Sequence, residues 1–188
     1  MRHLRRLLPR SLVSTVAALL LLSCSAVPAF AADPAPAKPT IRIKTGIMQP
    51  LTDEQGVVWQ PDDKGFADGE TIARPDIEIG NTKTPSLYRA ERYSMTKFSL
   101  KLPNGKYTVK LHFAETYEDI SGAGQRVFSF NVEGKAFKDF DPAKKAGGVR
   151  RAYIETVEVT IADGSLDITF TPGVENPEIN ALEIIPAG

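Results

Sequence analysis

From residue 41 to the C-terminus, the chain consists of short segments of alternating apolar and polar residues separated by turn sequences. A period of two is typical of half-buried β-strands, and no stretch of useful length has the i, i+3, i+4, i+7 spacing of an amphipathic helix. About ten short strands with turns every 8–12 residues predict an all-β antiparallel sandwich. The expected strands lie at 41–47, 57–59, 75–81, 97–102, 106–115, 126–134, 135–140, 152–161, 165–173 and 178–186.

The turn sequences also suggest how the strands pair. Pro103-Asn104-Gly105 is a tight-turn sequence and predicts that the strands on either side form a hairpin. The Ala-Asp-Gly at 162–164 predicts a second hairpin. We expect the first and last strands to pair and close the domain, and we expect the basic segment 143–151 to be a flexible, solvated loop.

The N-terminus has the pattern of an export signal. Four arginines precede an apolar run at 12–22, which is too short to span a bilayer comfortably, and small residues follow. Residues 1–31 are therefore predicted to be a signal peptide cleaved after Ala31, which places the protein in a secreted or periplasmic location. The alternative is a lipoprotein of the outer membrane or cell surface, acylated at Cys24, although Leu22 fits that pattern poorly.

Removal of residues 1–31 leaves 157 residues, enough for one domain with a real core. Residues 32–40 are rich in Pro and Ala and predict an extended spacer, so the folded domain is expected at 41–188. The four lost arginines leave 19 Lys+Arg against 23 Asp+Glu, a net charge of −4, which gives no reason to bind nucleic acid or anionic lipid. We predict a monomer without nucleic-acid partners and without membrane contact unless Cys24 carries a lipid.

The only cysteine leaves with the signal, and the mature domain keeps a single histidine, His112. These losses exclude a disulfide framework, a Cys/His zinc site and a cysteine nucleophile. His112 lies on the polar face of its predicted strand, where a lone histidine is usually structural. Oxygen ligands for Ca²⁺ exist in the Asp-rich loops, but no ligand spacing indicates a site, so no cofactor is predicted.

Some aromatic residues fall out of phase with the predicted core. Tyr93 precedes a break in the pattern at Ser94, and Tyr117 opens a loop after the strand that ends near Glu115. Loops on a rigid sandwich are where binding residues concentrate, and exposed aromatic rings suit the C–H faces of sugars. The alternative is that both rings only pin their loops. Five other aromatics are in phase and predicted to be core: Tyr107, Phe113, Phe128, Phe130 and Phe170.

Acidic residues gather near Tyr117 but do not form a convincing catalytic pair. Glu115 and Glu118 have odd spacing, which sends them to opposite faces of an extended chain, whereas a glycosidase holds two carboxyls across the sugar. Glu115 is in phase with the buried set and is expected to pair with Arg92 or Arg126. Glu118 and the neighbouring Asp119 are by default solvated loop residues. We therefore predict that the domain is not an enzyme.

Several segments, taken in order, resemble the malectin family across roughly residues 41–186. The opening TDEQGVVW is also similar to that family. The resemblance implies a jelly-roll, galactose-binding-like β-sandwich without catalysis that binds carbohydrate, and plant receptors reuse such domains, sometimes for peptides. The segments are LYRAERY (87–93), NGKYTVKLHFAETY (104–117), GQRVFSFNVEG (124–134), FDPAKKAGG (140–148), DGSLDITF (163–170) and ENPEINALEI (175–184).

The resemblance also implies a set of sugar-binding residues. Tyr93 and Tyr117 match two of the family's tyrosines, Glu118 stands where an aromatic is usual, and Glu175 stands where Asp is usual. A further family tyrosine has no clear match, with Phe66 the nearest candidate. We therefore expect an exported, lectin-like module of the cell envelope that recognises glucose-containing oligo- or polysaccharides. The alternative is a protein-interaction or cell-surface scaffold module that has lost sugar binding.

Overall fold

The computed structural model describes residues 38–187. The predicted signal peptide, Cys24 and most of the spacer lie outside the described residues. About half of the described residues lie in β-strands, and the only helical elements among them are one 3₁₀ turn and one short α-helix. In chain order its elements are β1 (Ile41–Lys44), β2 (Leu51–Thr52), β3 (Val58–Pro61), β4 (Glu70–Ala73), η1 (Pro85–Tyr88), β5 (Ala90–Tyr93), β6 (Lys97–Lys101), β7 (Gly105–Phe113), β8 (Val127–Val132), β9 (Lys135–Phe140), α1 (Pro142–Ala146), β10 (Tyr153–Ile161), β11 (Ser165–Val174), β12 (Glu178–Ile179) and β13 (Ala181–Pro186).

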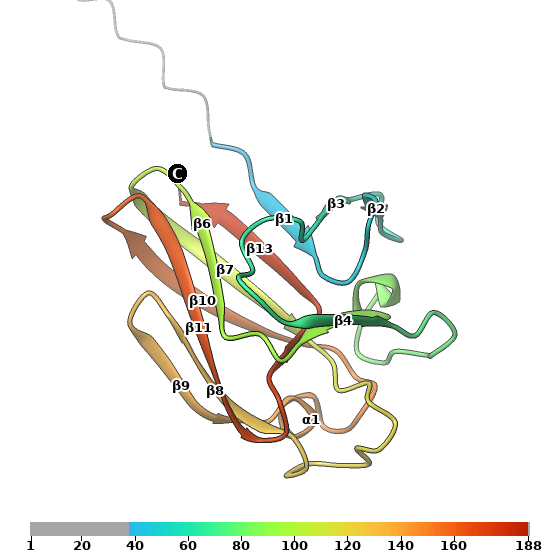
Figure 1. The fold of residues 1–188 in the computed structure, drawn as a ribbon. Helices are drawn as coiled ribbons and strands as arrows, with labels where there is room; N and C mark the ends of the chain where they lie inside the picture. Colours follow the sequence, from blue (N-terminus) through green and yellow to red (C-terminus); the bar gives the residue numbers. More distant parts are fainter. Residues whose placement is uncertain (1–37, 188) are drawn as a thin grey trace, which may run out of the picture. The chain divides into compact units, whose positions relative to one another are not determined.

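Two sheets form the sandwich (Figure 1). One has six strands in the order β10-β7-β13-β1-β3-β2, and the other has four in the order β6-β11-β8-β9. All their pairings are antiparallel except β1 with β3, which is parallel. As predicted, the first and last strands pair, with Ile43 opposite Leu182. The prediction of an all-β sandwich is confirmed.

The core lies between these two sheets because the alternation in each strand gives the sheets one apolar face. Phe113 from the six-stranded sheet packs among phenylalanines of the other sheet, 4.7 Å from Phe140 and 5.8 Å from Phe130 between ring centroids. All five aromatics predicted to be core are at most 4% exposed, which confirms that prediction. The sandwich is thus a rigid, close-packed support for the loops at its ends.

A third, small sheet with the order β12-β5-β4 carries the residues of interest. In Figure 1, β4 lies at the end of the sandwich remote from the C-terminus. The buried side chain of Asn180 ties this sheet to the sandwich, because its Nδ2 donates to the carbonyl of Ala90 (2.9 Å) and its Oδ1 accepts from the amide of Ala114 (2.6 Å). Lys44 Nζ also donates to the carbonyls of Ala90 (2.6 Å) and Asn180 (3.0 Å). The position of β5 is therefore fixed by buried polar contacts.

Both predicted hairpins are wrong. β6 pairs with β11, whereas β7 pairs with β10 and β13, so the turn at 103–105 connects the two sheets. The turn at 162–164 likewise joins β10 in one sheet to β11 in the other. Alternation places one face of each strand in the core, but it does not say whether successive strands lie side by side or face each other across the core. Connections that cross between the sheets suit a jelly roll.

Two local predictions also fail. Residues 75–81 form no strand beyond an isolated bridge between Gly80 and Arg151; the strand of this region is β4, whose four residues are all exposed and carry no alternating signal. The segment predicted to be a flexible loop contains α1. Its helix is specified by capping: Asp141 accepts from the amide of Lys144 (2.9 Å), and Gly147 ends the helix in the left-handed conformation at φ +76°.

No helix in the part of the chain from 38 to 187 is long and apolar enough to cross a membrane.

Candidate functional site

Strands β4 and β5 present one face of the small sheet to the end of the sandwich. Glu91 and Tyr93 alternate with Arg92 and therefore project to the same side of β5. Across the ladder, Ile72 is opposite Glu91 and Glu70 is opposite Tyr93, so these four side chains share a face. Arg92 projects to the other side, where it pairs with Asp62 at 2.7 Å.

This face forms one wall of a hollow of about 210 Å³, which we call the site hollow. Its other walls come from two distant loops: Tyr117 follows β7, and Glu175 with Asn176 connects β11 to β12. Glu175 has a backbone φ of +63°, a left-handed conformation that is uncommon for a non-glycine residue and is often found at functional sites. The full lining is Ile72, Arg74, Glu91, Tyr93, Tyr117, Arg126, Glu175 and Asn176.

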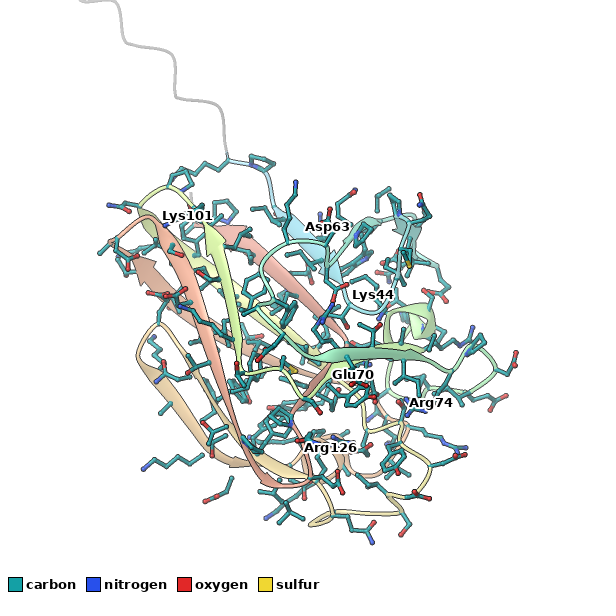
Figure 2. All side chains as sticks on the ribbon, in the orientation of Figure 1. Lys44, Asp63, Glu70, Arg74, Lys101 and Arg126 are labelled. Atoms are coloured by element: carbon teal, nitrogen blue, oxygen red, sulfur yellow. The ribbon has the colours of Figure 1, made fainter. Side chains whose placement is uncertain are left out.

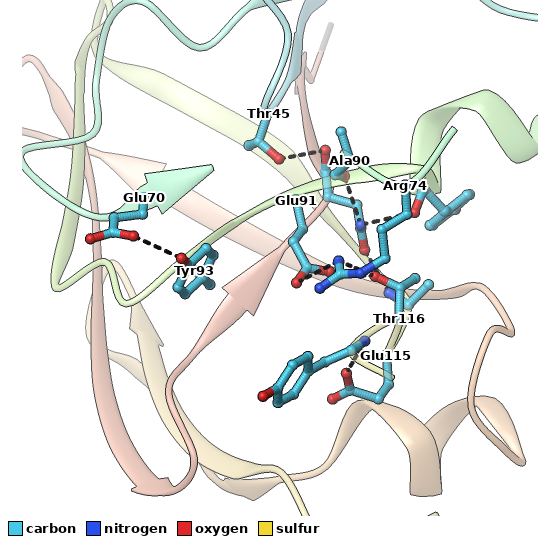
Figure 3. Close-up of polar contacts among 12 residues, drawn as sticks. Thr45, Glu70, Arg74, Ala90, Glu91, Tyr93, Glu115 and Thr116 are labelled. Carbon is cyan, nitrogen blue, oxygen red and sulfur yellow. Dashed lines mark hydrogen bonds and ion pairs between the residues drawn. The ribbon is translucent and has the colours of Figure 1, made fainter. Parts of the chain in front are cut away.

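Both site tyrosines are held by short hydrogen bonds to carboxylates. Tyr93 donates its hydroxyl hydrogen to Glu70 at 2.7 Å, as Figure 3 shows, and Tyr117 donates to Asp119 at 2.6 Å. These hydrogen bonds raise the pKa of both phenols, because the carboxylate stabilises the protonated hydroxyl. The rings are thus fixed before any ligand arrives, which lowers the entropic cost of stacking a sugar on them.

Two ion pairs form the floor of the site hollow. Arg74 Nη1 lies 3.2 Å from Oε1 of Glu91 and donates to the hydroxyl of Thr116 at 3.0 Å (Figure 3). The second pair joins Arg126 Nε to Glu115 Oε2 at 2.5 Å. This contact confirms that Glu115 pairs with one of the two arginines expected. Figure 2 shows Arg74, Arg126 and Glu70 at the same end of the domain, far from Lys101.

The second ion pair also positions both loops of the site. Glu115 Oε1 accepts from the backbone amide of Tyr117 at 2.9 Å, and Arg126 Nη1 donates to the carbonyl of Asn176. Because Glu115 is fully buried and Arg126 is 4% exposed, these contacts are shielded from water. The pair therefore sets the distance between Tyr117 and the loop that carries Glu175.

A further buried carboxyl lies beside this floor. Glu178 is fully buried, and neither of its oxygens has a hydrogen-bond partner among residues 38–187. Burial raises its pKa well above the ordinary value, and repulsion by Glu91 and Glu115 adds to that, against the attraction of Arg126 and Lys44. Burial also lowers the pKa of Lys44 to about 7. The carboxyl of Glu178 is therefore biased toward its protonated form.

The structure brings three of the five predicted site residues together. Tyr93, Tyr117 and Glu175 line the site hollow, whereas Glu118 lines an adjoining hollow of about 390 Å³ with Arg150, which we call the side hollow. The two hollows share Ile72, Arg74 and Tyr117, so they adjoin at these residues. Phe66 is not brought to either hollow. It packs on Phe98 at 5.0 Å between ring centroids, because the bridge between the two residues holds it against the core.

Sequence reasoning missed one of the two ion pairs of the charged floor, the pair of Arg74 with Glu91. Glu91 could have been found from its spacing, since it precedes Tyr93 by two residues in a strand and must share its face. Arg74 gave no usable signal, because it follows a strand that the pattern did not reveal. His112 is away from the site hollow and 3% exposed, with Nδ1 2.9 Å from the hydroxyl of Tyr88 and Nε2 3.4 Å from Glu183, as a structural histidine would be.

Within residues 38–187, no group of three or more His, Cys, Asp or Glu side chains is arranged to hold a metal ion.

A β-sandwich with a hollow at its end that is lined by aromatic and acidic side chains is typical of ligand-binding domains. Comparison with known proteins agrees with this class. The family model described as "Malectin domain" matches residues 40–182. A probable LRR receptor-like serine/threonine-protein kinase of Arabidopsis thaliana is 29% identical over 142 residues, which cover 65% of this chain and 14% of the relative. The chain therefore spans about one seventh of that receptor's length.

Solved structures share the fold at low sequence identity. A β-glucuronidase of Bacteroides uniformis matches with a TM-score of 0.72 and 19% identity, covering 80% of this chain and 18% of that one. A complex of the plant peptide RALF23 with FER and LLG2 contains a chain that matches with a TM-score of 0.68 and 17% identity, covering 78% of this chain and 48% of that one.

The match over residues 40–182 shows that the chain belongs to the malectin domain family. Membership of this family supports the interpretation of the chain as a non-catalytic module of the carbohydrate-binding type.

Proposed function

We propose that this protein is an exported, non-catalytic module that binds glucose-containing oligo- or polysaccharides in the site hollow. The observation that carries the proposal is the convergence of Tyr93, Tyr117 and Glu175 on one hollow from three separate segments. In this proposal the two rings stack on the sugar and Glu175 accepts hydrogen bonds from its hydroxyl groups. Glu118 accepts from a second sugar unit that extends into the side hollow.

The size and polarity of the two hollows suit small polar units. Their volumes of about 210 and 390 Å³ are at or below the low end of the range for drug-sized ligands. A sugar in such an open, wet site loses nearly as many hydrogen bonds to water as it gains, so the affinity should lie on the order of micromolar to millimolar.

The absence of catalysis is supported by the state of the carboxylates. A glycosidase needs two free carboxyl groups across the sugar. Here Glu91 is bound to Arg74 and Thr116, and Glu115 is bound to Arg126. Glu175 is the exposed carboxylate that lines the site hollow. No turnover of chromogenic glycosides is expected.

Export is supported by the arginine-led apolar segment at the N-terminus and by the receptor-like character of the curated relative. The intact mass of the mature protein from the producing cell decides between cleavage after Ala31 and acylation of Cys24.

Isothermal titration calorimetry with glucans and α-glucobioses tests the binding proposal. The wild type should give measurable heat at millimolar sugar, and the variant Tyr93→Ala plus Tyr117→Ala should give none. Tyr153→Ala serves as a control, because Tyr153 is a half-buried tyrosine that does not line the site hollow. Absence of heat with every sugar, or unchanged binding in the double variant, would contradict the proposal.

Protein binding is the second candidate, and one structural observation favours it. β4 is the outermost strand of the small sheet, all of its residues are exposed, and Ile72 at 38% exposure lies at the edge of both hollows. Such an edge can add a strand from an extended peptide. A pull-down from an envelope extract, repeated with sugar as competitor, separates the two functions: a partner retained at saturating sugar favours a scaffold module.

A further inference from the structure

The exposed acceptors of the site hollow come from its two tyrosines and Glu175, whereas Arg74, Arg126 and Asn176 are its donors. Tyr93 and Tyr117 each commit their only hydroxyl hydrogen to a carboxylate, at 2.7 and 2.6 Å, so both phenolic oxygens can act only as acceptors toward a ligand. Glu175 adds two further acceptor oxygens. A ligand that fits this pattern must itself be rich in donors.

The charges around the site hollow point the same way. Five exposed carboxylates lie on or beside its walls or in the adjoining side hollow, belonging to Glu70, Asp76, Glu118, Asp119 and Glu175. The two arginines that line the site hollow are already neutralised, Arg74 by Glu91 and Arg126 by Glu115. Arg150, in the side hollow, offsets only one of the five exposed charges. The opening of the site hollow therefore has a negative electrostatic potential, which attracts cations and repels anions.

Glu178 on β12 is a further carboxyl of the small sheet. Glu178 lies directly opposite Tyr93 in the pairing of β12 with β5, so its side chain projects to the same face as Tyr93 and Glu91. Both of its oxygens lack a hydrogen-bond partner within the described residues, although it is fully buried. Because Glu178 does not line the site hollow and burial raises its pKa, it adds neither a contact nor a charge to a ligand there, and the selectivity rests on the exposed acceptors.

We propose that the site hollow selects a glucose-configured sugar that carries a free, protonated amino group, in preference to neutral and acidic sugars. This inference rests on the proposed carbohydrate-binding function. An ammonium group brings three hydrogen-bond donors, and the faces of Tyr93 and Tyr117 attract cations as well as C–H groups. An N-acetyl group removes the charge, and a uronic carboxylate reverses it. Recognition therefore depends on the unacylated amine and on Glu175, the exposed carboxylate that lines the site hollow.

Calorimetric titrations with glucose, glucosamine, N-acetylglucosamine and glucuronic acid test the inference at about pH 6, where an amine of this type is protonated. Glucosamine should bind about fivefold more tightly than glucose at low salt, as expected for one solvent-accessible charge interaction with a cation–π contribution. The advantage should shrink to less than about twofold at 0.5 M salt, where charges are screened beyond roughly 4 Å. Glu175→Gln should weaken the binding of glucosamine more than the binding of glucose, and so remove most of the advantage. Glu158→Gln, an exposed position on β10, should retain it.

The outcomes separate this inference from the function on which it rests. Equal binding of glucose and glucosamine overturns the amino-sugar inference and leaves carbohydrate binding intact. Tighter binding of glucuronic acid also overturns it, because the arginines would then face the ligand. Binding of none of the four sugars, nor of their oligomers, removes the proposed function and the inference together.

Discussion

Replacing Arg126 by Met removes the cation that balances the buried carboxylate of Glu115. The two side chains are 4% and 0% exposed and 2.5 Å apart, so both charges are largely shielded from water. The substitution takes away a charged hydrogen bond of about 1.5–3 kcal/mol and leaves the carbonyl of Asn176 short of a donor, a loss of about 1–3 kcal/mol. The expected fall in the free energy of unfolding is 3–5 kcal/mol, the usual range for breaking a buried ion pair from one side.

The double variant Arg126→Met plus Glu115→Gln tests the cause of that loss. It removes the uncompensated charge, and a buried ion pair replaced by neutral groups often costs little. We therefore expect it to recover more than about half of the stability lost in the single variant. The double variant should still bind sugar poorly, because the donor that holds the carbonyl of Asn176, next to Glu175, is still missing.

Urea denaturation followed through the fluorescence of Trp59 is the suitable assay, since this single tryptophan is 3% exposed and reports its exposure on unfolding. The reasoning is refuted if Arg126→Met loses less than about 1 kcal/mol, a value typical of surface pairs. It is also refuted if the double variant is as unstable as the single one.

Three further outcomes are expected. Because the pKa of Glu178 is raised, the folded state keeps a proton that the unfolded state releases above about pH 4.3. From that pH up to the folded-state pKa, the free energy of unfolding of the wild type should fall by about 1.4 kcal/mol per pH unit relative to Glu178→Gln. Denaturation at several pH values measures this difference. Equal slopes in both proteins would contradict this. Gly173→Ala should lower the free energy of unfolding by about 1–3 kcal/mol, because the added Cβ would lie 2.6 Å from the backbone oxygen of Val127. Gly122→Ala is the control and should be neutral or slightly stabilising, because the space around it is open. Equal effects of the two variants in thermal melts would disprove the packing argument. Tyr93→Phe should keep the ring face for stacking but remove the hydrogen bond that ties the ring to Glu70. Calorimetry should therefore show sugar binding weakened about threefold rather than abolished. A complete loss of binding would contradict stacking on this ring.

The strands and the core could be predicted from the sequence because alternation records which side chains are buried. Val109 and Leu111 on β7 and Ile168 on β11 show the pattern clearly and are fully buried. Sheet membership could not be predicted in the same way, since strands that face each other across a core have the same alternation as strands in a hairpin. β4 was missed because all four of its residues are exposed.

The site was predictable in its aromatic part and only partly in its charged part, where the sequence indicated that Glu115 pairs with Arg92 or Arg126. Tyr93 and Tyr117 stand at strand ends, where the loss of periodicity is visible in the sequence. Arg74 and Arg126 reach the site hollow through long-range pairing, which no local pattern encodes. Glu118 was correctly placed in a loop, but the turn after Tyr117 directs it into the side hollow rather than beside the two tyrosines.

Chemical-shift mapping with an α-glucobiose tests the central claim most directly, because it locates the ligand as well as detecting it. The account predicts that amide signals of 91–93, 117 and 175–176 shift together at millimolar sugar, and that the Tyr93→Ala plus Tyr117→Ala variant shows no such shifts. Shifts confined to another surface, such as the cavity lined by Trp59 and His112, would contradict the assignment of the site hollow as the sugar-binding site.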